Sequence, residues 1–142
     1  MLGTMSRWLR YLLVPVTLAA ALGCPQETAV WVTSGSVAPP LVFRLGPKRG
    51  LQSNVSLGML TVFRCLGDDA SRIGDTVWKA RSSGTAQPTS EVSYGALPIG
   101  FVAAVEATPQ TPGCYVVQIS GTGRTRFRIA RNGSVTDEGD PW

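Results

Sequence analysis

Apolar and polar positions alternate near the C-terminal end of the chain in a way that predicts two paired strands. Residues 124–130 place Arg124, Arg126 and Arg128 on one face and apolar or threonine side chains on the other, the period of two that marks a half-buried strand. The preceding run, 112–121, is largely apolar and leads into a short glycine-containing loop. Such a loop between two strand-like runs predicts a β-hairpin.

Similar runs upstream predict a fold built of strands alone. We expect strands at 29–33, 41–45, 60–65, 76–80, 91–94 and 101–105, and a last short piece at Val135. Glycine and proline are plentiful between these runs, at 16 and 10 residues, which fits tight turns. Seven or eight short strands at regular spacing are the number expected of a β-sandwich. The predicted fold class is therefore all-β.

The N-terminal 24 residues have the pattern of a targeting segment. Arg7 and Arg10 precede a stretch without charge, rich in leucine, valine and alanine, that ends at Cys24. A basic start, an apolar run and a small-residue end form a secretory signal, and the arginines keep the N-terminus in the cytoplasm. We expect one hydrophobic helix in 1–24 as a signal peptide or retained transmembrane anchor, a periplasmic sandwich in 25–135 and an acidic tail in 136–142.

Three fates of this segment stay open. Ala21-Leu22-Gly23-Cys24 resembles the lipobox of bacterial lipoproteins, in which the cysteine is lipidated, although Ala21 stands where leucine is usual. The same residues also suit ordinary cleavage. A retained anchor from Ser6 to Gly23 would be about 27 Å long, against a hydrocarbon core of about 30 Å. Trp8 and Tyr11 would then lie at the membrane interface.

Charge and composition argue against several functions. The net charge is +4, and leaving out Arg7 and Arg10 reduces it to +2, too little for a nucleic-acid interface. The chain has no histidine, which removes the usual general base, the commonest metal ligand and the usual haem ligand. No nucleophile–base pair or carboxylate pair stands at an interpretable spacing. We therefore expect no enzymatic activity, no cofactor and no bound metal.

Two of the three cysteines are expected to form a disulfide. Cys65 closes one predicted strand and Cys114 opens another, and both follow the targeting segment, so they reach a compartment in which disulfides persist. We expect the bond to join the two sheets of the sandwich. Cys24 is then the remaining cysteine, either lipidated or free within the anchor.

The order of Cys65, Trp78 and Cys114 resembles that of an immunoglobulin-like domain, and the start of the Cys114 strand resembles bacterial fibronectin-like modules. The tryptophan stands 13 residues, and the second cysteine 49 residues, after Cys65. This resemblance implies an immunoglobulin-like sandwich with Trp78 packed on an inter-sheet disulfide. The family's tyrosine stands two residues before the second cysteine, where this chain has Pro112.

Together these features favour a non-catalytic accessory subunit that stabilises or caps a larger complex in the bacterial cell membrane, such as a respiratory or photosynthetic reaction-centre complex. The alternative is a free surface or periplasmic lipoprotein whose sandwich binds a small ligand or glycan. The expected partners are the membrane and other subunits of such a complex. The residues expected at the interface are Trp8, Tyr11, Trp31, Trp142 and the arginines 124, 126 and 128.

Overall fold

A computed structural model describes residues 28–33, 35–36, 41–47, 56–67, 69–84, 87–120 and 123–140. Within these ranges all regular secondary structure is strand, as the sequence predicts. The strands are β1 (Thr28–Val32), β2 (Gly35–Ser36), β3 (Val42–Pro47), β4 (Met59–Leu66), β5 (Asp69–Ser82), β6 (Glu91–Ser93), β7 (Phe101–Val105), β8 (Gly113–Ile119), β9 (Arg124–Ile129) and β10 (Ser134–Gly139).

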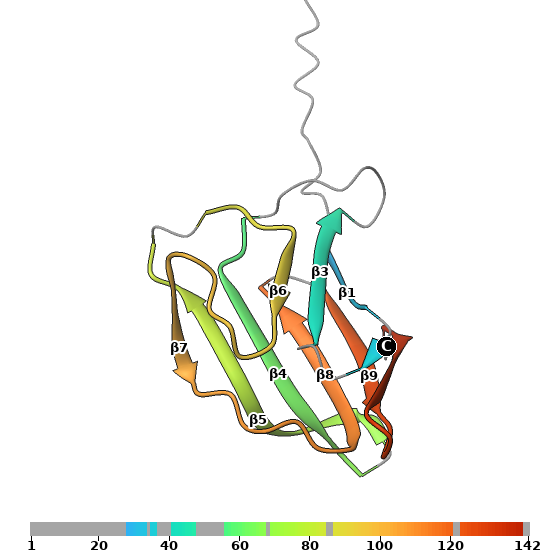
Figure 1. The fold of residues 1–142 in the computed structure, drawn as a ribbon. Coiled ribbons are helices and arrows are strands. Elements are labelled where there is room, and N and C mark those ends of the chain that lie inside the picture. Colours follow the sequence, from blue (N-terminus) through green and yellow to red (C-terminus); the bar gives the residue numbers. More distant parts are fainter. Residues whose placement is uncertain are drawn as a thin grey trace, which may run out of the picture.

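The strands form two antiparallel sheets that face each other (Figure 1). The smaller sheet has the order β1-β3-β6, and the larger has the order β2-β10-β9-β8-β4-β5-β7. Strands distant in sequence are neighbours in both sheets. β4, for example, lies between β5 and β8.

The alternation in the C-terminal hairpin is confirmed. β8 and β9 pair antiparallel, with Val117 opposite Thr125. Along β9, Thr125, Phe127 and Ile129 are buried while the three arginines that alternate with them are half-buried. The apolar face of β9 therefore covers the core and its basic face lies on the outside of the larger sheet.

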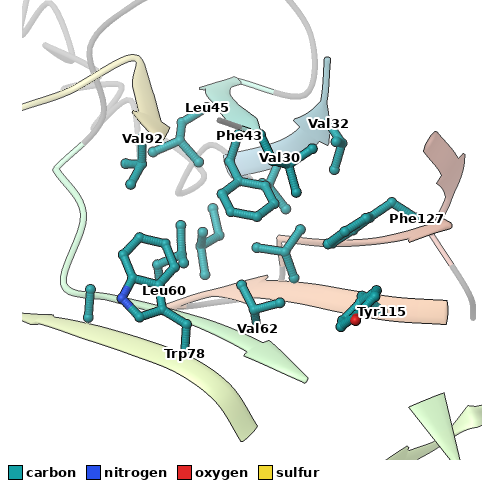
Figure 2. Close-up of a cluster of buried hydrophobic side chains, with 14 of the residues drawn as sticks. Val30, Val32, Phe43, Leu45, Leu60, Val62, Trp78, Val92, Tyr115 and Phe127 are labelled. Atoms are coloured by element: carbon teal, nitrogen blue, oxygen red, sulfur yellow. The ribbon is translucent and has the colours of Figure 1, made fainter. Parts of the chain in front are cut away.

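The core fills the space between the two sheets and is rich in aromatic side chains (Figure 2). Phe43 of the smaller sheet lies 5.8 Å from Phe127 and 6.5 Å from Trp78 of the larger one, measured between ring centroids. Trp78 is 1% exposed. Close packing of such large side chains is the main stabilising contact between the layers.

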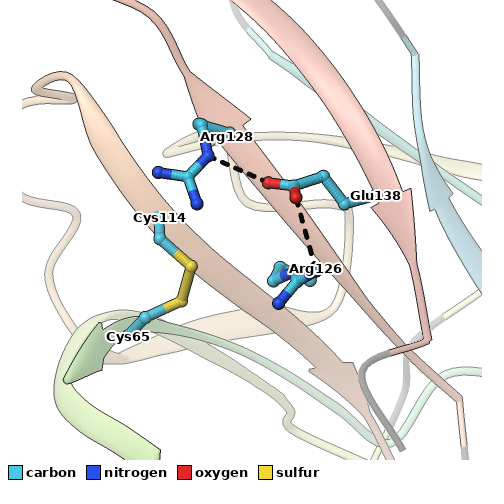
Figure 3. Close-up of a disulfide and its surroundings, with 5 residues drawn as sticks. All are labelled: Cys65, Cys114, Arg126, Arg128 and Glu138. Atoms are coloured by element: carbon cyan, nitrogen blue, oxygen red, sulfur yellow. Dashed lines mark hydrogen bonds and ion pairs between the residues drawn. A yellow bond between two sulfur atoms is a disulfide. The ribbon is translucent and has the colours of Figure 1, made fainter. Parts of the chain in front are cut away.

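The Cys65–Cys114 disulfide is confirmed, but its expected position is wrong. The pairing of β4 with β8 ends at Arg64 and Tyr115, and the two cysteines are the next residue on each strand, with 5.3 Å between their Cα atoms. The bond therefore joins neighbouring strands of one sheet instead of two sheets. It lies on the outer face, beside Arg126 and Arg128 (Figure 3). Trp78 belongs to the core between the sheets, so its expected packing on the disulfide is wrong as well.

Two strands extend beyond their predicted ranges. The run predicted at 76–80 is the last part of β5, which begins at Asp69. Asp137 and Glu138, expected in a tail after Val135, belong to β10, which pairs with β9 from Val135 to Gly139. Backbone pairing places these polar residues in the sheet, because a sheet that is covered on one face alone accepts polar side chains on the other.

The predictions for the N-terminal segment fall on residues 1–27, outside the described ranges. Trp8, Tyr11 and Cys24 belong to this segment. Trp142, at the other end of the sequence, is also outside the described ranges. Among the residues described, no helix has the length and apolarity needed to cross a membrane.

Candidate interaction surface

The three arginines of β9 are paired with acidic residues on β10 and directly after it. Glu138 binds two of them, with Arg126 Nη2 3.3 Å from Oε2 and Arg128 Nε 3.1 Å from Oε1 (Figure 3). Arg124 Nε lies 3.5 Å from Asp140 Oδ1. Exposed ion pairs of this kind each contribute about 0–1 kcal/mol to the stability of the fold. Their larger effect is to neutralise the basic stripe, which weakens the case for it as a site for an acidic partner.

Asp137, also on β10, connects the two sheets. Its Oδ2 accepts a hydrogen bond of 2.8 Å from the Val32 N–H of β1. Its Oδ1 accepts from the Thr125 hydroxyl at 2.7 Å and from the Gly139 N–H at 2.8 Å. A register shift between Asp137 and Gly139 turns the strand at this point. The carboxylate thereby ties the edge of the smaller sheet to β9 and β10.

A groove of about 250 Å³ runs beside this connection, between β1 and the adjoining ends of β9 and β10. It brings together Trp31 and Arg124, two residues that the sequence placed separately at an interface. Trp31 packs over Gly46, since a Cβ on that glycine would stand 3.1 Å from the tryptophan ring. Asp137 and Asp140 line the other side. The groove thus offers an aromatic wall, a guanidinium and two carboxylates.

An apolar loop connects β6 to β7. Residues 95–100 carry no charged and no hydrogen-bonding side chain. Leu97 is 43% exposed and Ile99 is 82% exposed, the highest value among the exposed large hydrophobic residues described. Backbone bonds from Ala96 N–H to Ser93 O (3.0 Å) and from Phe101 N–H to Pro98 O (3.1 Å) fix the loop. The backbone of the loop is therefore fixed by hydrogen bonds, while its apolar side chains Leu97 and Ile99 are exposed to solvent.

The outer face of the larger sheet has a second hollow, of about 360 Å³. Thr61 stands at its centre, opposite Lys79 on one side and Gln118 on the other. Phe63 contributes an aromatic face. Hydroxyl, amide, ammonium and aromatic groups on one shallow surface suit a polar, hydroxyl-rich or anionic small molecule.

Tyr94 carries the one clear pKa shift among the described residues. Burial raises the pKa of its hydroxyl, and hydrogen bonding to Thr108 opposes that effect. The hydroxyl donates to Thr108 O at 2.8 Å, and the ring meets Trp78 edge-on at 5.2 Å. This partly buried tyrosine packs against the core beside β6.

Sequence reasoning missed Asp137 and Glu138 because it assigned them to a tail. A signal for the correct assignment was present in Asn132-Gly133, a dipeptide typical of tight hairpins. Gly133 has φ 82°, and Asn132 Oδ1 accepts from the Ser134 N–H at 3.0 Å. This turn returns the chain antiparallel to β9.

Comparison of the chain with protein families, with curated proteins and with solved structures found no match.

Proposed function

We propose that the protein is a non-catalytic accessory subunit, held in the bacterial cell membrane by residues 1–24, whose periplasmic sandwich binds another subunit of a membrane complex. The groove that brings together Trp31 and Arg124 carries this proposal. These residues are 93 positions apart in the chain. Aromatic side chains and arginine are enriched in protein–protein interfaces and among the residues that dominate binding energy.

The disulfide supports the periplasmic location. A bond between Cys65 and Cys114 is typical of proteins that mature in an oxidising compartment and rare in cytosolic ones. The basic and apolar pattern of 1–24 points to the same compartment. Two independent features of the chain thus agree on export.

The strand neighbours support an immunoglobulin-like form of the sandwich. If β1, β3 and β6 correspond to strands A, B and E, then β4, β8 and β9 correspond to C, F and G, the grouping of that fold. Tyr115 on β8 adds a second likeness. Its hydroxyl donates to Thr111 O at 2.7 Å, four residues upstream, the type of bond made by the tyrosine corner of these domains.

A photo-crosslinking amino acid at position 31 tests the proposal in intact membranes. We expect it to capture a partner subunit and the same residue at exposed position 75 to capture none. After mild solubilisation the protein should migrate on a native gel in a larger assembly, and Trp31→Ala should weaken that association. Migration as a lone species of 15.1 kDa, with no product from position 31, would refute the subunit role.

The outer-face hollow favours a second candidate, a free lipoprotein that binds a glycan or another small ligand. Ligand-observed NMR with neutral and acidic oligosaccharides tests it on the purified protein. Saturation transfer that disappears in Gln118→Ala and persists in Trp31→Ala would favour this function. Absence of saturation transfer to both the neutral and the acidic oligosaccharides would refute glycan binding as the function.

A further inference from the structure

The sandwich has two ends, and Thr28 marks one of them. Gly123 lies against Thr28, because a Cβ on that glycine would meet the Thr28 carbonyl oxygen. Neighbouring contacts continue across this end. Ile119 N–H bonds Gly123 O at 2.8 Å, and the Ser120 hydroxyl accepts from Gly58 N–H at 3.1 Å.

The same end includes the start of β7. Ser82 N–H bonds Gly58 O, and Ser83 N–H bonds Gly100 O, both at 2.8 Å. Ile99 directly precedes Gly100, so this last exposed residue of the apolar loop lies at the end of the sandwich from which Thr28 begins. We call it the Thr28 end. It is the upper end in Figure 1, where β5 finishes and β7 begins.

Exposed apolar side chains gather at the Thr28 end around a cation. Arg81 stands between Met59 on β4 and Val102 on β7, directly opposite each of them. Met59 and Val102 are both exposed, as is Ile99, which precedes Gly100 at this end. Apolar side chains next to an exposed cation are suited to the interface of a bilayer with anionic headgroups.

The short stretch of chain before Thr28 favours the bilayer as the partner of this apolar surface. Cys24 ends the apolar N-terminal run, and Thr28 is four residues later. An extended chain spans at most about 3.5 Å per residue, so these four positions reach about 14 Å. A transmembrane anchor and a lipid on Cys24 both fix residue 24 at the membrane surface. Either attachment therefore keeps the Thr28 end within about 14 Å of that surface.

We propose that the Thr28 end rests on the membrane, with Ile99 inserted into the bilayer interface and Arg81 at the headgroups. This inference depends on the membrane attachment in the proposed function and does not depend on a partner subunit. It gives the domain a fixed orientation, in which a short tether and Ile99 hold the same end against the bilayer.

A fluorescent, environment-sensitive amino acid at position 99 tests the orientation in the full chain, reconstituted in vesicles of zwitterionic and anionic phospholipid. Position 132 is the matched control, since it lies in the β9–β10 turn at the opposite end. We expect emission from position 99 to shift to shorter wavelength and to fall about two-fold or more when the acyl chains are brominated. Emission from position 132 should not change. Charge reversal by Arg81→Glu should reduce the quenching at position 99.

Equal emission and equal quenching at the two positions would overturn the proposal. A shift at position 99 without quenching by brominated lipid would show that protein covers the loop, and would also overturn it. Flotation of the vesicles separates this result from failure of the proposed function. If the protein does not float with the lipid, the attachment is wrong and both proposals fall. If it floats and position 99 is not quenched, the orientation alone is wrong.

Discussion

Cys65 and Cys114 face each other across β4 and β8, on the outer face of the larger sheet. Their bond closes a loop with a sequence separation of 49 and lies outside the aromatic core. It therefore stabilises the pairing of two central strands, while contact between the two sheets depends on core packing and on Asp137.

Reduction of this disulfide is expected to lower the free energy of unfolding by about 4 kcal/mol, because the reduced unfolded chain regains the entropy of a loop of that length. Urea denaturation with and without reductant measures the difference. A Cys65→Ala/Cys114→Ala variant is the control and should be insensitive to reductant. An unchanged midpoint on reduction of the native chain would contradict the expectation.

Asp137→Ala should destabilise the protein by about 2–4 kcal/mol, since it leaves the Val32 N–H, the Gly139 N–H and the Thr125 hydroxyl without their acceptor. Asp137→Asn keeps one acceptor oxygen and should therefore lower the free energy of unfolding by less than Asp137→Ala does. Asp75→Ala is the matched control at an exposed carboxylate, with an expected change within about 0.5 kcal/mol. Urea denaturation should rank the three variants in this order, and equal losses at positions 137 and 75 would refute the role of Asp137.

Stability is expected to fall at alkaline pH through Tyr94. Its pKa is raised in the folded protein, so below the unfolded value of about 10 the hydroxyl is protonated in both states and its contribution is complete. As the pH rises through the folded pKa, the unfolded state ionises first and stability is lost. Tyr94→Phe should lower the free energy of unfolding by about 1 kcal/mol near neutral pH and should show a smaller further loss as the pH rises above about 10. A loss of the same size in both proteins would exclude Tyr94 as its source.

The strands were predictable wherever one face of the chain is apolar. β9 alternates strictly between arginine and buried side chains, and the range of β7 matches its prediction. β10 was predicted only at Val135, because this is its sole buried residue and the residues that follow are polar. This strand is stabilised by backbone pairing with β9. Such pairing leaves no signal in the pattern of apolar side chains.

The positions of the cysteines and of the interface residues depended on strand order, which the local pattern does not encode. Cys65 and Cys114 were correctly paired, yet whether they join two sheets or two neighbouring strands is decided by β8 lying beside β4. The contacts of Arg124 likewise required β10 to be recognised as a strand. Trp31 and Arg124 were separate predictions until β1 and β9 came together.

The hydrogen bond from Val32 to Asp137 spans 105 positions in the chain, which has a consequence for the order of events during synthesis. β1 therefore cannot make this bond until the 105 positions that follow Val32 have been synthesised. Contacts of such high sequence separation form late, because the loop between them must first be closed. The edge of the smaller sheet at Val32 therefore stays without this link to the larger sheet until β10 has been made.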